Sequence, residues 1–383
     1  MLKNMVEKMK ILMLLSNPFM VDPRVSREAK SLIDNGHEVT VIVWDRKNDY
    51  SEHEVVDDVN LIRIHNKGLM KLLPNDLFRN PLWWRTAYKK ALELYKTNEF
   101  KFDVVHCHDL DTLQSGVWLK KKLGIKLIYD AHEIFGYMIS GDMPKVVVKA
   151  AFWMEKRLIK NVDHVITVNE PLKKYFKSIT HKPITIVMNC KDLISEEYQP
   201  PKNDVFIICY IGILHKSRMF PEIIDVIGNI ENIKFVIAGK KENLYDEVKE
   251  KSKKYKNIKF LGTIPFEEVI PRTMESNAIL CLFDPTNPNN EMGLPNKIFE
   301  GMITGRPIIV TKGLYYSKII EKEKCGISVD YDKEEIRKSI IKLRDNSKLC
   351  EELGKNALKA AIREYNWKKQ EEKLLRIYKE LKK

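Results

Sequence analysis

Short apolar runs rich in valine and isoleucine alternate with amphipathic segments along almost the whole chain, and this alternation constrains the fold most. One series of runs comprises 10–15, 37–44, 102–107, 126–130, 163–168 and 184–188, and a second comprises 205–212, 234–239, 258–262, 278–283 and 306–311. Nearly continuous apolar runs are typical of parallel strands buried on both faces, with helices as crossovers. The pattern predicts an α/β protein of two Rossmann-like, doubly wound parallel-sheet domains that face a cleft.

The chain length agrees with two domains, because 383 residues exceed the roughly 250–300 at which a single core stops growing. Between the two series lies SEEYQPPKND (195–204), which is polar, contains proline and lacks periodicity, as expected of a linker. We therefore expect an N-terminal domain over 1–194 and a C-terminal domain over 205–365. The last segment, 366–383, has its apolar residues toward one face and is expected to be a docked helix.

The formal net charge of +13 fits an anionic small substrate, an anionic membrane surface, nucleic acid, or only a solvated lysine-rich surface. The sequence lacks zinc-finger spacing, RNP-type aromatic motifs and a helix-turn-helix pattern, so nucleic acid is not an expected partner. The early run ILMLL is shorter than the roughly 7–15 apolar residues of a signal peptide, and a cytoplasmic protein is expected. Its six cysteines form no CxxC pair and are expected to be reduced and structural.

Two segments, 69–90 and 144–160, combine large apolar residues with lysine and arginine. In the first, Trp83 and Trp84 adjoin Arg85, which favours an interfacial helix on an anionic membrane and a peripheral location on its inner face. The second is apolar almost all round between 146 and 154, which favours a buried core helix.

Histidine and aspartate are concentrated where two apolar runs end. FDVVHCHDLDTL (102–113) carries His106, His108 and Asp109, and YDAHE carries His132. Side chains two apart on a strand point the same way, so His106 and His108 share a face. A metal site, separately satisfied polar residues and a site for hydroxyl groups are the open alternatives. Neutral imidazoles beside a carboxylate favour a polyhydroxylated ligand such as a sugar.

The second half of the chain carries features of an anion site. GLPNKIFEGMITGRPIIV (293–310) opens with a glycine loop before a helix, whose free N–H groups suit phosphate. Lys297 and Glu300 lie three apart on that helix, which fits either a nucleotide site or a surface ion pair. Arg218 follows the run that ends at Gly212, and its guanidinium could clamp a diphosphate.

In their order and spacing, these segments resemble family 4 of the retaining glycosyltransferases (the group 1 glycosyltransferases), which have the GT-B fold. The likeness is carried by DPRVSREAKSLIDNGHEVTVIV, FDVVHCHDLDTL, KLIYDAHE, VDHVITVNEPL, IVMNCKDL, YIGILHKSR, FVIAGK, GLPNKIFEGMITGRPIIV and YNWKKQEEKLLRIY. The resemblance implies a nucleotide-sugar donor bound mainly by the second domain, an acceptor bound by the first, no metal, and a final helix that joins the N-terminal domain.

The sequence departs from the family pattern at two charged positions. The family often has two glutamates eight residues apart; Glu300 matches the second, but Met292 stands at the first and Glu291 is one position away. Asn289, Asn290 or Glu291 are the candidates to replace the missing contact. The family often has arginine after the phosphate-loop glycine, where this chain has Ile213, so Lys297 is expected to replace that cation.

The resemblance implies a metal-independent, hexosyltransferase-type retaining glycosyltransferase in cell-surface glycan or glycolipid synthesis. It needs no cofactor, since the nucleoside diphosphate sugar is a co-substrate, and its other partner is a glycan or lipid-linked acceptor. The residues expected to be catalytic are His132, Arg218 and Lys297. Those expected to bind substrate are His108, Asp109, Gly212, Glu291, Gly293, Asn296 and Glu300. The alternatives are a sugar-nucleotide 2-epimerase of the same fold and a catalytically inactive nucleotide-sugar-binding protein.

Overall fold

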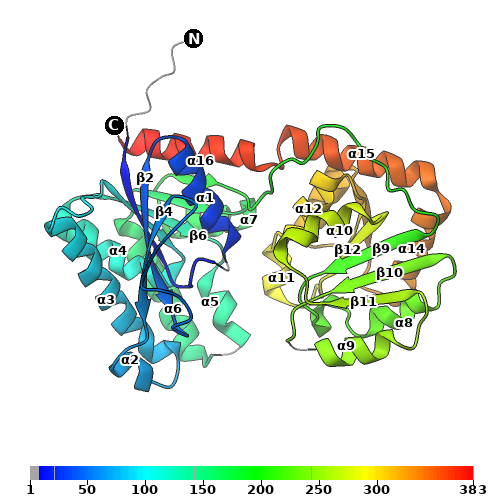
Figure 1. Cartoon of the computed structure of the whole chain (residues 1–383), viewed down its shortest axis with the longest axis horizontal. Helices are drawn as coiled ribbons and strands as arrows, with labels where there is room; N and C mark the ends of the chain where they lie inside the picture. The colour runs from blue at the N-terminus through cyan, green and yellow to red at the C-terminus, as the bar shows by residue number, and fades with distance from the viewer. Residues whose placement is uncertain (1–7, 21, 142, 243, 383) are drawn as a thin grey trace, which may run out of the picture. The chain divides into compact units, whose positions relative to one another are not determined.

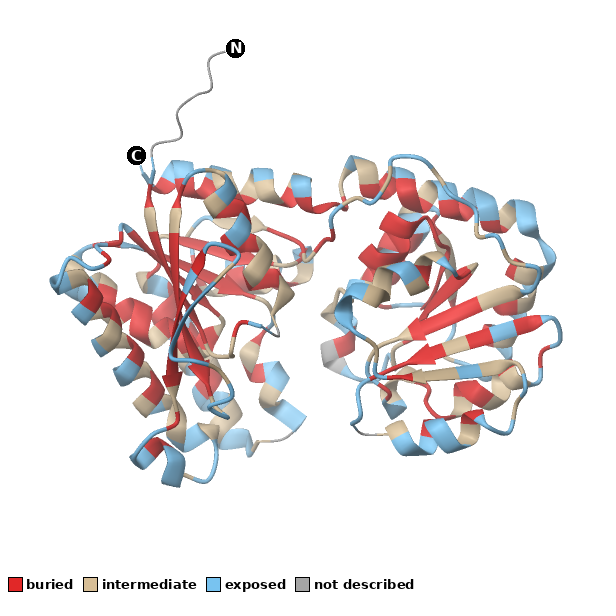
Figure 2. Cartoon of the chain, viewed as in Figure 1, coloured by how far each residue is buried: buried red, intermediate tan, exposed pale blue. Residues whose placement is uncertain are grey.

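The computed structural model describes residues 8–20, 22–141, 143–242 and 244–382. The chain forms two compact units: one extends to Met188 and includes the residues from Gln370 on, and the other runs from Asn189 to Lys369. Each unit contains a largely parallel sheet with helices on its faces, which confirms the predicted α/β class (Figure 1). The strands form the buried part of each unit (Figure 2).

The first unit contains a sheet with the order β3-β4-β2-β1-β5-β6-β7-β8 among its described residues. Its strands are β1 (Lys10–Leu15), β2 (Glu38–Asp45), β3 (His53–Val56), β4 (Val59–His65), β5 (Val104–His108), β6 (Lys126–Ala131), β7 (His164–Thr167) and β8 (Ile184–Ile186). All neighbours are parallel except β3 and β4. This hairpin is not evident from the sequence, because β3 is mostly exposed and has no apolar run. Asp57 and Asp58 form its turn with positive φ, as tight hairpins require.

The helices of the first unit are α1 (Pro23–Asp34), α2 (Leu69–Leu72), α3 (Asp76–Lys96), α4 (Leu110–Leu123), α5 (Phe135–Met138), α6 (Lys145–Leu158) and α7 (Glu170–Ile179). The unit also includes most of α16 (Trp367–Leu381), since the part of this helix from Gln370 on belongs to it. The short 3₁₀ turns are η1 (Ile139–Gly141) and η2 (Ile159–Asn161). Helix α1 begins at Pro23, because the Asp22 side chain accepts the Val25 N–H and proline suits the first turn.

The alternation of side chains along β5 divides the helices between the two faces of the first sheet. Cys107 faces α4, where a Cβ on Gly116 would lie 2.3 Å from its Sγ, so glycine allows the helix to pack closely. His106 faces the opposite way, toward Glu28 of α1 and Tyr378 of α16. The final helix therefore covers the histidine side of the sheet.

The second unit contains an all-parallel sheet with the order β11-β10-β9-β12-β13-β14 among its described residues. Its strands are β9 (Phe206–Ile211), β10 (Ile233–Ala238), β11 (Ile258–Gly262), β12 (Ala278–Cys281), β13 (Ile308–Thr311) and β14 (Gly326–Val329). Its helices are α8 (Glu222–Gly228), α9 (Tyr245–Ser252), α10 (Val269–Met274), α11 (Pro288–Met292), α12 (Asn296–Thr304), α13 (Tyr315–Glu323), α14 (Lys333–Asp345) and α15 (Ser347–Arg363), with 3₁₀ turns η3 (Lys216–Arg218) and η4 (Phe266–Glu268).

The two units divide ahead of the stretch 195–204 that the sequence suggested as a linker. The boundary falls between Met188 and Asn189. Asn189 already bonds within the second unit, since its side-chain amide donates to Asn296 Oδ1 at 2.8 Å. Met188 still belongs to the first unit, where its N–H donates to Gln370 Oε1 at 3.2 Å. The polar composition of 195–204 therefore marks a surface segment of the second unit.

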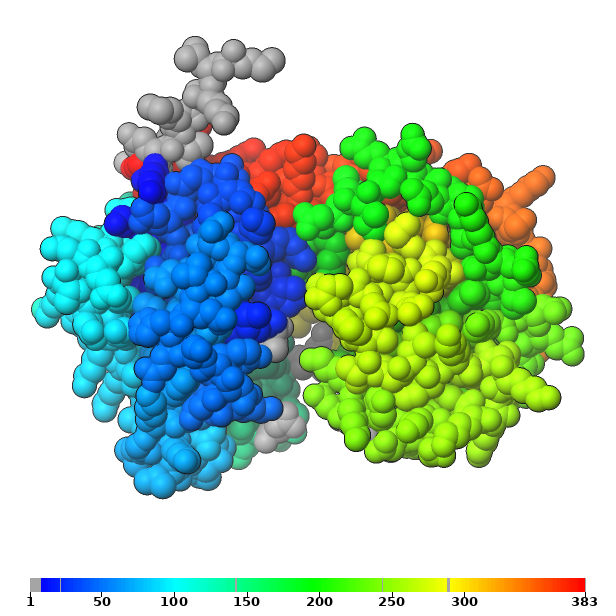
Figure 3. Space-filling model, viewed as in Figure 1, coloured from blue at the N-terminus to red at the C-terminus, as the bar shows by residue number. Residues whose placement is uncertain are grey.

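The tryptophans of the two segments differ in burial from what the sequence suggested. Trp83 is fully buried and stacks on Trp44 with ring centroids 5.4 Å apart. The indoles of Trp83 and Trp84 both donate to the Asp111 carbonyl, at 3.1 and 2.7 Å. The predicted interfacial role of this tryptophan pair is therefore wrong, because its N–H groups and one of its rings are used inside the unit. Figure 3 shows the neighbouring α2 segment at the surface of this unit, at the lower edge of the view.

The segment expected to be core, 144–160, forms α6 with apolar side chains in solvent. Val146 is 72% exposed and Trp153 is 61% exposed. Only Ala151, Glu155 and Leu158 of this helix are buried. The apolar run does not reveal this face, because Ala151, Glu155 and Leu158 pack inward while larger apolar residues of the same run, such as Trp153, do not.

The described cysteines are all buried free thiols, as expected. None of the helices in the described ranges is long and apolar enough to cross a bilayer.

Candidate functional site

The polar residues of the first unit gather at the carboxyl ends of β5 and β6. These strands pair in parallel with His108 opposite Asp130, and the Asp109 N–H donates to the Asp130 carbonyl at 2.8 Å. His106 and His108 share one face, as predicted, and their rings stack with centroids 4.3 Å apart. Asp109 has a φ of 60° and stands before α4, yet its carboxylate turns away from the helix and accepts the His132 N–H at 3.0 Å.

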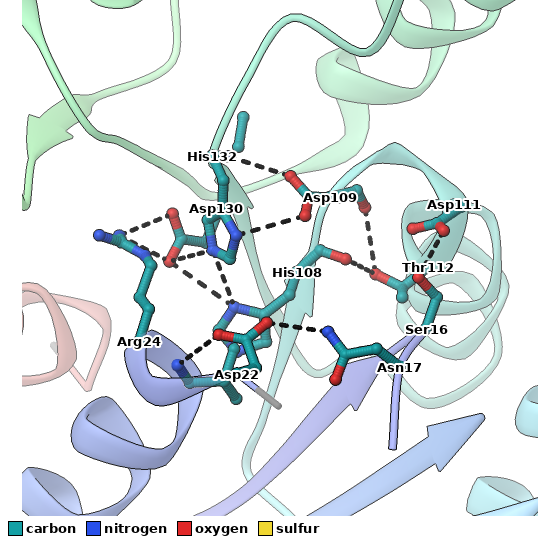
Figure 4. A network of polar contacts seen from close by, with 12 residues as sticks. Ser16, Asn17, Asp22, Arg24, His108, Asp109, Asp111, Thr112, Asp130 and His132 are labelled. Atoms are coloured by element: carbon teal, nitrogen blue, oxygen red, sulfur yellow. Dashed lines mark hydrogen bonds and ion pairs between the residues drawn. The ribbon is translucent and has the colours of Figure 1, made fainter. Parts of the chain in front are cut away.

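His132 lies between two carboxylates (Figure 4). Its Nδ1 is 3.3 Å from Asp109 Oδ2, and its Nε2 is 3.4 Å from Asp130 Oδ2. The His108 Nδ1 lies 3.4 Å from the same Nε2. His132 keeps about 19% of its side chain exposed, whereas His108 and Asp130 are fully buried. The sequence-predicted residues His108, Asp109 and His132 are therefore in contact, with His132 at the solvent side.

The two carboxylates determine the charge of His132. Burial would lower the pKa of His132, but Asp109 and Asp130 together raise it to about 10. Burial would raise the pKa of Asp130, but Arg24 and then His132 hold it well below its usual range. Burial raises the pKa of Asp109 to about 7, against the effect of His132. At neutral pH the site is therefore an imidazolium beside an ionised Asp130, with Asp109 close to its titration point.

A layer of charged residues that the sequence analysis missed lies behind His132. Arg24 of α1 is only 3% exposed, and Glu28, one turn further on, is fully buried. The Arg24 guanidinium donates to both oxygens of Asp130, at 3.1 and 3.0 Å, and its Nη2 is 3.0 Å from Glu28 Oε1. The available signal was their place on the apolar face of the helix, beside Val25 and Ala29. Charged residues in that position need buried partners.

Four of these buried side chains have donor atoms within 4.8 Å of one another: Glu28, His106, His108 and Asp130. Their identities suit a transition metal. Their arrangement does not, because the Arg24 cation already occupies both oxygens of Asp130 and approaches Glu28. The stacked imidazoles, tilted by only 24°, also cannot converge on one ion as they stand. The group fits a guanidinium better than a divalent cation.

Asp111, from the same motif, has a structural role. Its carboxylate accepts from the Ser16 hydroxyl, while its carbonyl accepts from the two indoles of α3. The Thr112 hydroxyl donates to the His108 carbonyl at 2.8 Å. These bonds fasten the first turn of α4 to the strand ends and so fix the backbone that carries Asp109.

In the second unit, Gly212 and Lys297 are in contact. Gly212 follows β9 with a φ of 154°, and a Cβ there would lie 2.3 Å from Lys297 Nζ. A side chain at this position would displace the amine from the strand end, and glycine also suits the positive φ. The amine lies 4.6 Å from the centre of the Tyr210 ring, and the Tyr210 hydroxyl donates to the Ile213 carbonyl at 2.6 Å.

Arg218 lies at the same end of this sheet, in η3. Its guanidinium lies 3.4 Å from the centre of the Phe283 ring, and Nη1 donates to the Ser217 hydroxyl at 2.8 Å. Burial lowers the pKa of Arg218, although the residue remains a cation at neutral pH. Burial raises the pKa of Tyr210, and the charges of Lys297 and then Arg218 act to lower it. In the described part of the chain, neither forms an ion pair with a carboxylate.

The predicted residues on α12 have separate partners. Glu300 is 7% exposed and has its Oε1 3.9 Å from Lys191 Nζ, so it does not form the surface pair with Lys297 that the spacing allowed. Lys191, which the sequence analysis missed, also lies 4.6 Å from the centre of the Phe266 ring. Asn296, the first residue of α12, accepts from Asn189.

The segment before α12 contains the candidates for the absent first glutamate. Glu291 is exposed in α11, while the Asn290 amide donates to the Asp284 carbonyl at 2.8 Å. The Gly293 N–H donates to the Asn290 carbonyl at 3.3 Å. The Asn290 amide is therefore used within the loop, whereas Glu291 presents an exposed carboxylate.

Comparison with known proteins identifies the family. Residues 24–193 match Glycosyltransferase Family 4, and residues 193–360 match Glycosyl transferases group 1. MJ1069 of Methanocaldococcus jannaschii, an uncharacterized glycosyltransferase, is 23% identical over 365 residues, 87% of each chain. YqgM of Bacillus subtilis, also an uncharacterized glycosyltransferase, is 20% identical over 67% of this chain and 72% of its own.

Solved structures identify the fold. Sucrose-phosphate synthase from Thermosynechococcus elongatus superposes with a TM-score of 0.76 at 14% identity, over 97% of this chain and 99% of its own. Anabaena HepE in complex with UDP-glucose gives 0.70 at 14% identity, over 97% and 100%. The two parallel-sheet units are those of the GT-B class of glycosyltransferases. The chain belongs to glycosyltransferase family 4, the group 1 glycosyltransferases.

Proposed function

We propose that this protein is a retaining glycosyltransferase that moves a sugar from a nucleoside diphosphate to an acceptor hydroxyl. The observation that carries the proposal is the pair of cations, Arg218 and Lys297, that stand without a carboxylate partner in the described residues of the second unit. Unpaired, partly buried cations at the carboxyl ends of parallel strands suit an anionic ligand. A diphosphate supplies that anion.

The proposed chemistry breaks the bond between the anomeric carbon and the diphosphate oxygen. The oxygen of the acceptor hydroxyl bonds to the anomeric carbon, and its proton passes to the departing diphosphate. Arg218 and Lys297 stabilise the negative charge that grows on the leaving group, and the His132 imidazolium adds a further donor. Glu300 is proposed to bind the ribose, and Gly293 and Asn296 the diphosphate at the start of α12. Glu291 is proposed to contact the sugar, because it is the exposed carboxylate beside Met292.

The relatives support a nucleotide-sugar donor. HepE has been solved with UDP-glucose and with UDP and glucose. At 14% identity, these complexes support a nucleotide sugar as the class of donor, and the proposal does not extend to a particular base or sugar.

Binding of the donor is tested by thermal stabilisation with a panel of nucleotide sugars. A ligand at 100 times its dissociation constant adds about 2.7 kcal/mol to the free energy of unfolding. We expect one or a few donors to raise the melting temperature of the wild type, and the Lys297→Ala variant to lose most of the increase. Lys312→Ala, which removes an exposed lysine of the same unit, serves as the control. The proposal fails if no nucleotide sugar, UDP or GDP shifts the transition.

Catalysis is tested separately from binding. The methionine in place of the first family glutamate makes an inactive binding protein the second candidate. If the protein binds a nucleotide sugar but neither hydrolyses it nor transfers the sugar, it is an inactive binding protein. If it converts the nucleotide sugar to its epimer in the absence of an acceptor, it is an epimerase. We further propose that no metal or other cofactor takes part, so dialysis against a chelator is expected to leave turnover unchanged.

We propose that the acceptor is carried on an anionic membrane and that α6 docks there. Val146 and Trp153 are exposed on one side of the helix at a spacing of seven, with Tyr137 and Met138 of α5 also exposed. The exposed charges of α6 are the cations Lys145, Lys149, Lys156 and Arg157, since Glu155 is buried. Exposed apolar side chains among cations fit the headgroup region of an anionic bilayer, where each cation contributes about 1 kcal/mol.

The membrane proposal predicts sedimentation with vesicles that contain phosphatidylserine, and little with neutral phosphatidylcholine vesicles. Salt and the double change Val146→Ser with Trp153→Ser are expected to weaken the binding at least tenfold. Val55→Ser is the matched control, because Val55 is 68% exposed on the edge strand β3. Equal sedimentation of the double variant and the control would contradict docking through α6. WaaG, a glycosyltransferase of this fold, is involved in lipopolysaccharide biosynthesis, which supports the proposal that this protein acts in cell-surface glycan synthesis.

A further inference from the structure

The buried ionisable residues behind His132 have no part in the transfer reaction as proposed. Arg24, Glu28 and His106 lie beneath the site and are at most 3% exposed. Burying polar or charged side chains is costly unless they have partners, so this group is expected to serve a purpose. Arg24 and His106 both approach Asp130, and Figure 4 shows Asp130 between Arg24 and His132.

The Arg24 guanidinium fixes the orientation of Asp130. One of its nitrogens donates to the Val187 carbonyl at 2.8 Å, and the other donates to both Asp130 oxygens. The Asp130 carboxylate is therefore held in one plane with Oδ2 toward the imidazoles. That oxygen lies 3.7 Å from His106 Nε2, 3.7 Å from His108 Nδ1 and 3.4 Å from His132 Nε2.

The other two histidines are held in a neutral form that leaves His132 as the proton carrier. His106 has its Nδ1 2.7 Å from the Tyr378 hydroxyl of α16. Burial lowers the pKa of His106, and burial together with His106 lowers that of His108 well below its usual value. Of the three histidines at these strand ends, His132 is the one with a carboxylate near each ring nitrogen, which is the arrangement that stabilises a doubly protonated ring.

We propose that Asp130 is a positioning residue, held by Arg24, that keeps His132 as an imidazolium with Nε2 and Nδ1 directed at two carboxylates. The inference rests on the proposed function for the part His132 plays in catalysis. His132 then meets the leaving group as a cation and is not a general base. Its charge persists through neutral pH and is lost only as the pH rises toward 10, the pKa of His132.

The groups that face His132 come from three elements. Arg24 and Glu28 belong to α1, while His106, His108 and Asp109 belong to β5 and its end, and Asp130 and Glu133 belong to β6 and its end. Burial raises the pKa of Glu28 to about 8, so it is mostly protonated at neutral pH and leaves Asp130 as the buried anion. At Nε2, the charge of Asp130 therefore acts to raise the pKa of His132, and the charge of Arg24 acts to lower it.

The test is an NMR titration of the full chain with labelled histidine, in which His132→Gln identifies the resonance. In the wild type, both His132 nitrogens are expected to be protonated at neutral pH. In Asp130→Asn, the pKa of His132 is expected to fall by roughly 1 to 3 pH units, the usual effect of one adjacent opposite charge. Glu155→Gln is the control, because Glu155 is an equally buried carboxyl that bonds to Tyr129 and Tyr175 and not to His132.

Three outcomes would overturn the proposal. The first is a wild-type His132 that titrates near its ordinary value, a result that needs no variant to fold. The second is a folded Asp130→Asn variant with an unchanged His132 pKa. The third is a stoichiometric divalent metal, found by elemental analysis in the wild type and lost in Asp130→Asn, which would make the buried group a metal site.

Activity separates this inference from the proposed function. Where a donor is turned over, the alkaline limb of the kcat profile is expected to move to lower pH in Asp130→Asn by the same amount as the NMR pKa, and Glu155→Gln is expected to leave it in place. If the NMR result holds and no nucleotide sugar is turned over, the proposed function fails and the positioning of His132 stands.

Discussion

Replacing Arg218 with alanine is expected to lower kcat/KM for the nucleotide sugar about 10²- to 10³-fold, the loss typical of one preorganised donor to a developing anion. The guanidinium lies on the Phe283 ring with Ser217 as its hydrogen-bond partner, so it is already oriented before substrate binds. Preorganisation of this kind is why the effect is expected to be large, and the measurement is steady-state turnover.

The matched control for Arg218 is Lys216→Ala. Lys216 lies in the same 3₁₀ turn but is exposed, and its backbone carbonyl, which the substitution keeps, accepts from Met219 and Tyr331. The Lys216→Ala variant is expected to keep kcat/KM within about threefold of the wild type, which corresponds to a change of less than about 1 kcal/mol in the activation free energy. If the two variants lose activity equally, the effect is one of general charge, and Arg218 does not contact the diphosphate.

Replacing Trp83 with alanine is expected to destabilise the protein by about 3–5 kcal/mol, the usual cost of removing a buried large aromatic side chain. Trp83 is fully buried, stacks on Trp44 and donates to the Asp111 carbonyl at the first turn of α4. The loss leaves a cavity between α3 and the sheet. Denaturant unfolding, with an unchanged m-value, measures the effect.

Trp153→Ala is the control for the stability prediction, because Trp153 is 61% exposed on α6. Surface substitutions of this kind usually change stability by about 0.5 kcal/mol or less. If Trp83→Ala were as mild as Trp153→Ala, the packing of α3 on β2 described here would be wrong. The pair also separates stability from vesicle binding, since the proposed docking uses Trp153 and not Trp83.

Local patterns in the sequence were sufficient for the fold class and for the main strands. Valine- and isoleucine-rich runs, helix caps such as Asp22 and stops such as Gly36 act over a few neighbouring residues, so they can be recognised without knowing what packs against them. The hairpin β3–β4 escaped because β3 is largely exposed and lacks such a run. Residues at strand ends, such as His108 and Asp109, were also recognisable, because parallel strands bring their carboxyl ends to one edge.

Burial and partner choice depended on the tertiary structure. Trp83 and Trp153 are alike in sequence context, yet one is buried and the other exposed, because only the packed unit determines which side of each helix meets the sheet. Lys297 and Glu300 have the spacing of a surface pair, but each is drawn to a different partner from a distant part of the chain. Arg24 of α1 and Asp130 of β6 are 106 residues apart. Periodicity acts over one or two turns, whereas an ion pair of this separation exists only after the sheet has formed. The sequence by itself therefore determined the strand that leads to His132, and the tertiary structure alone decided which charges surround it.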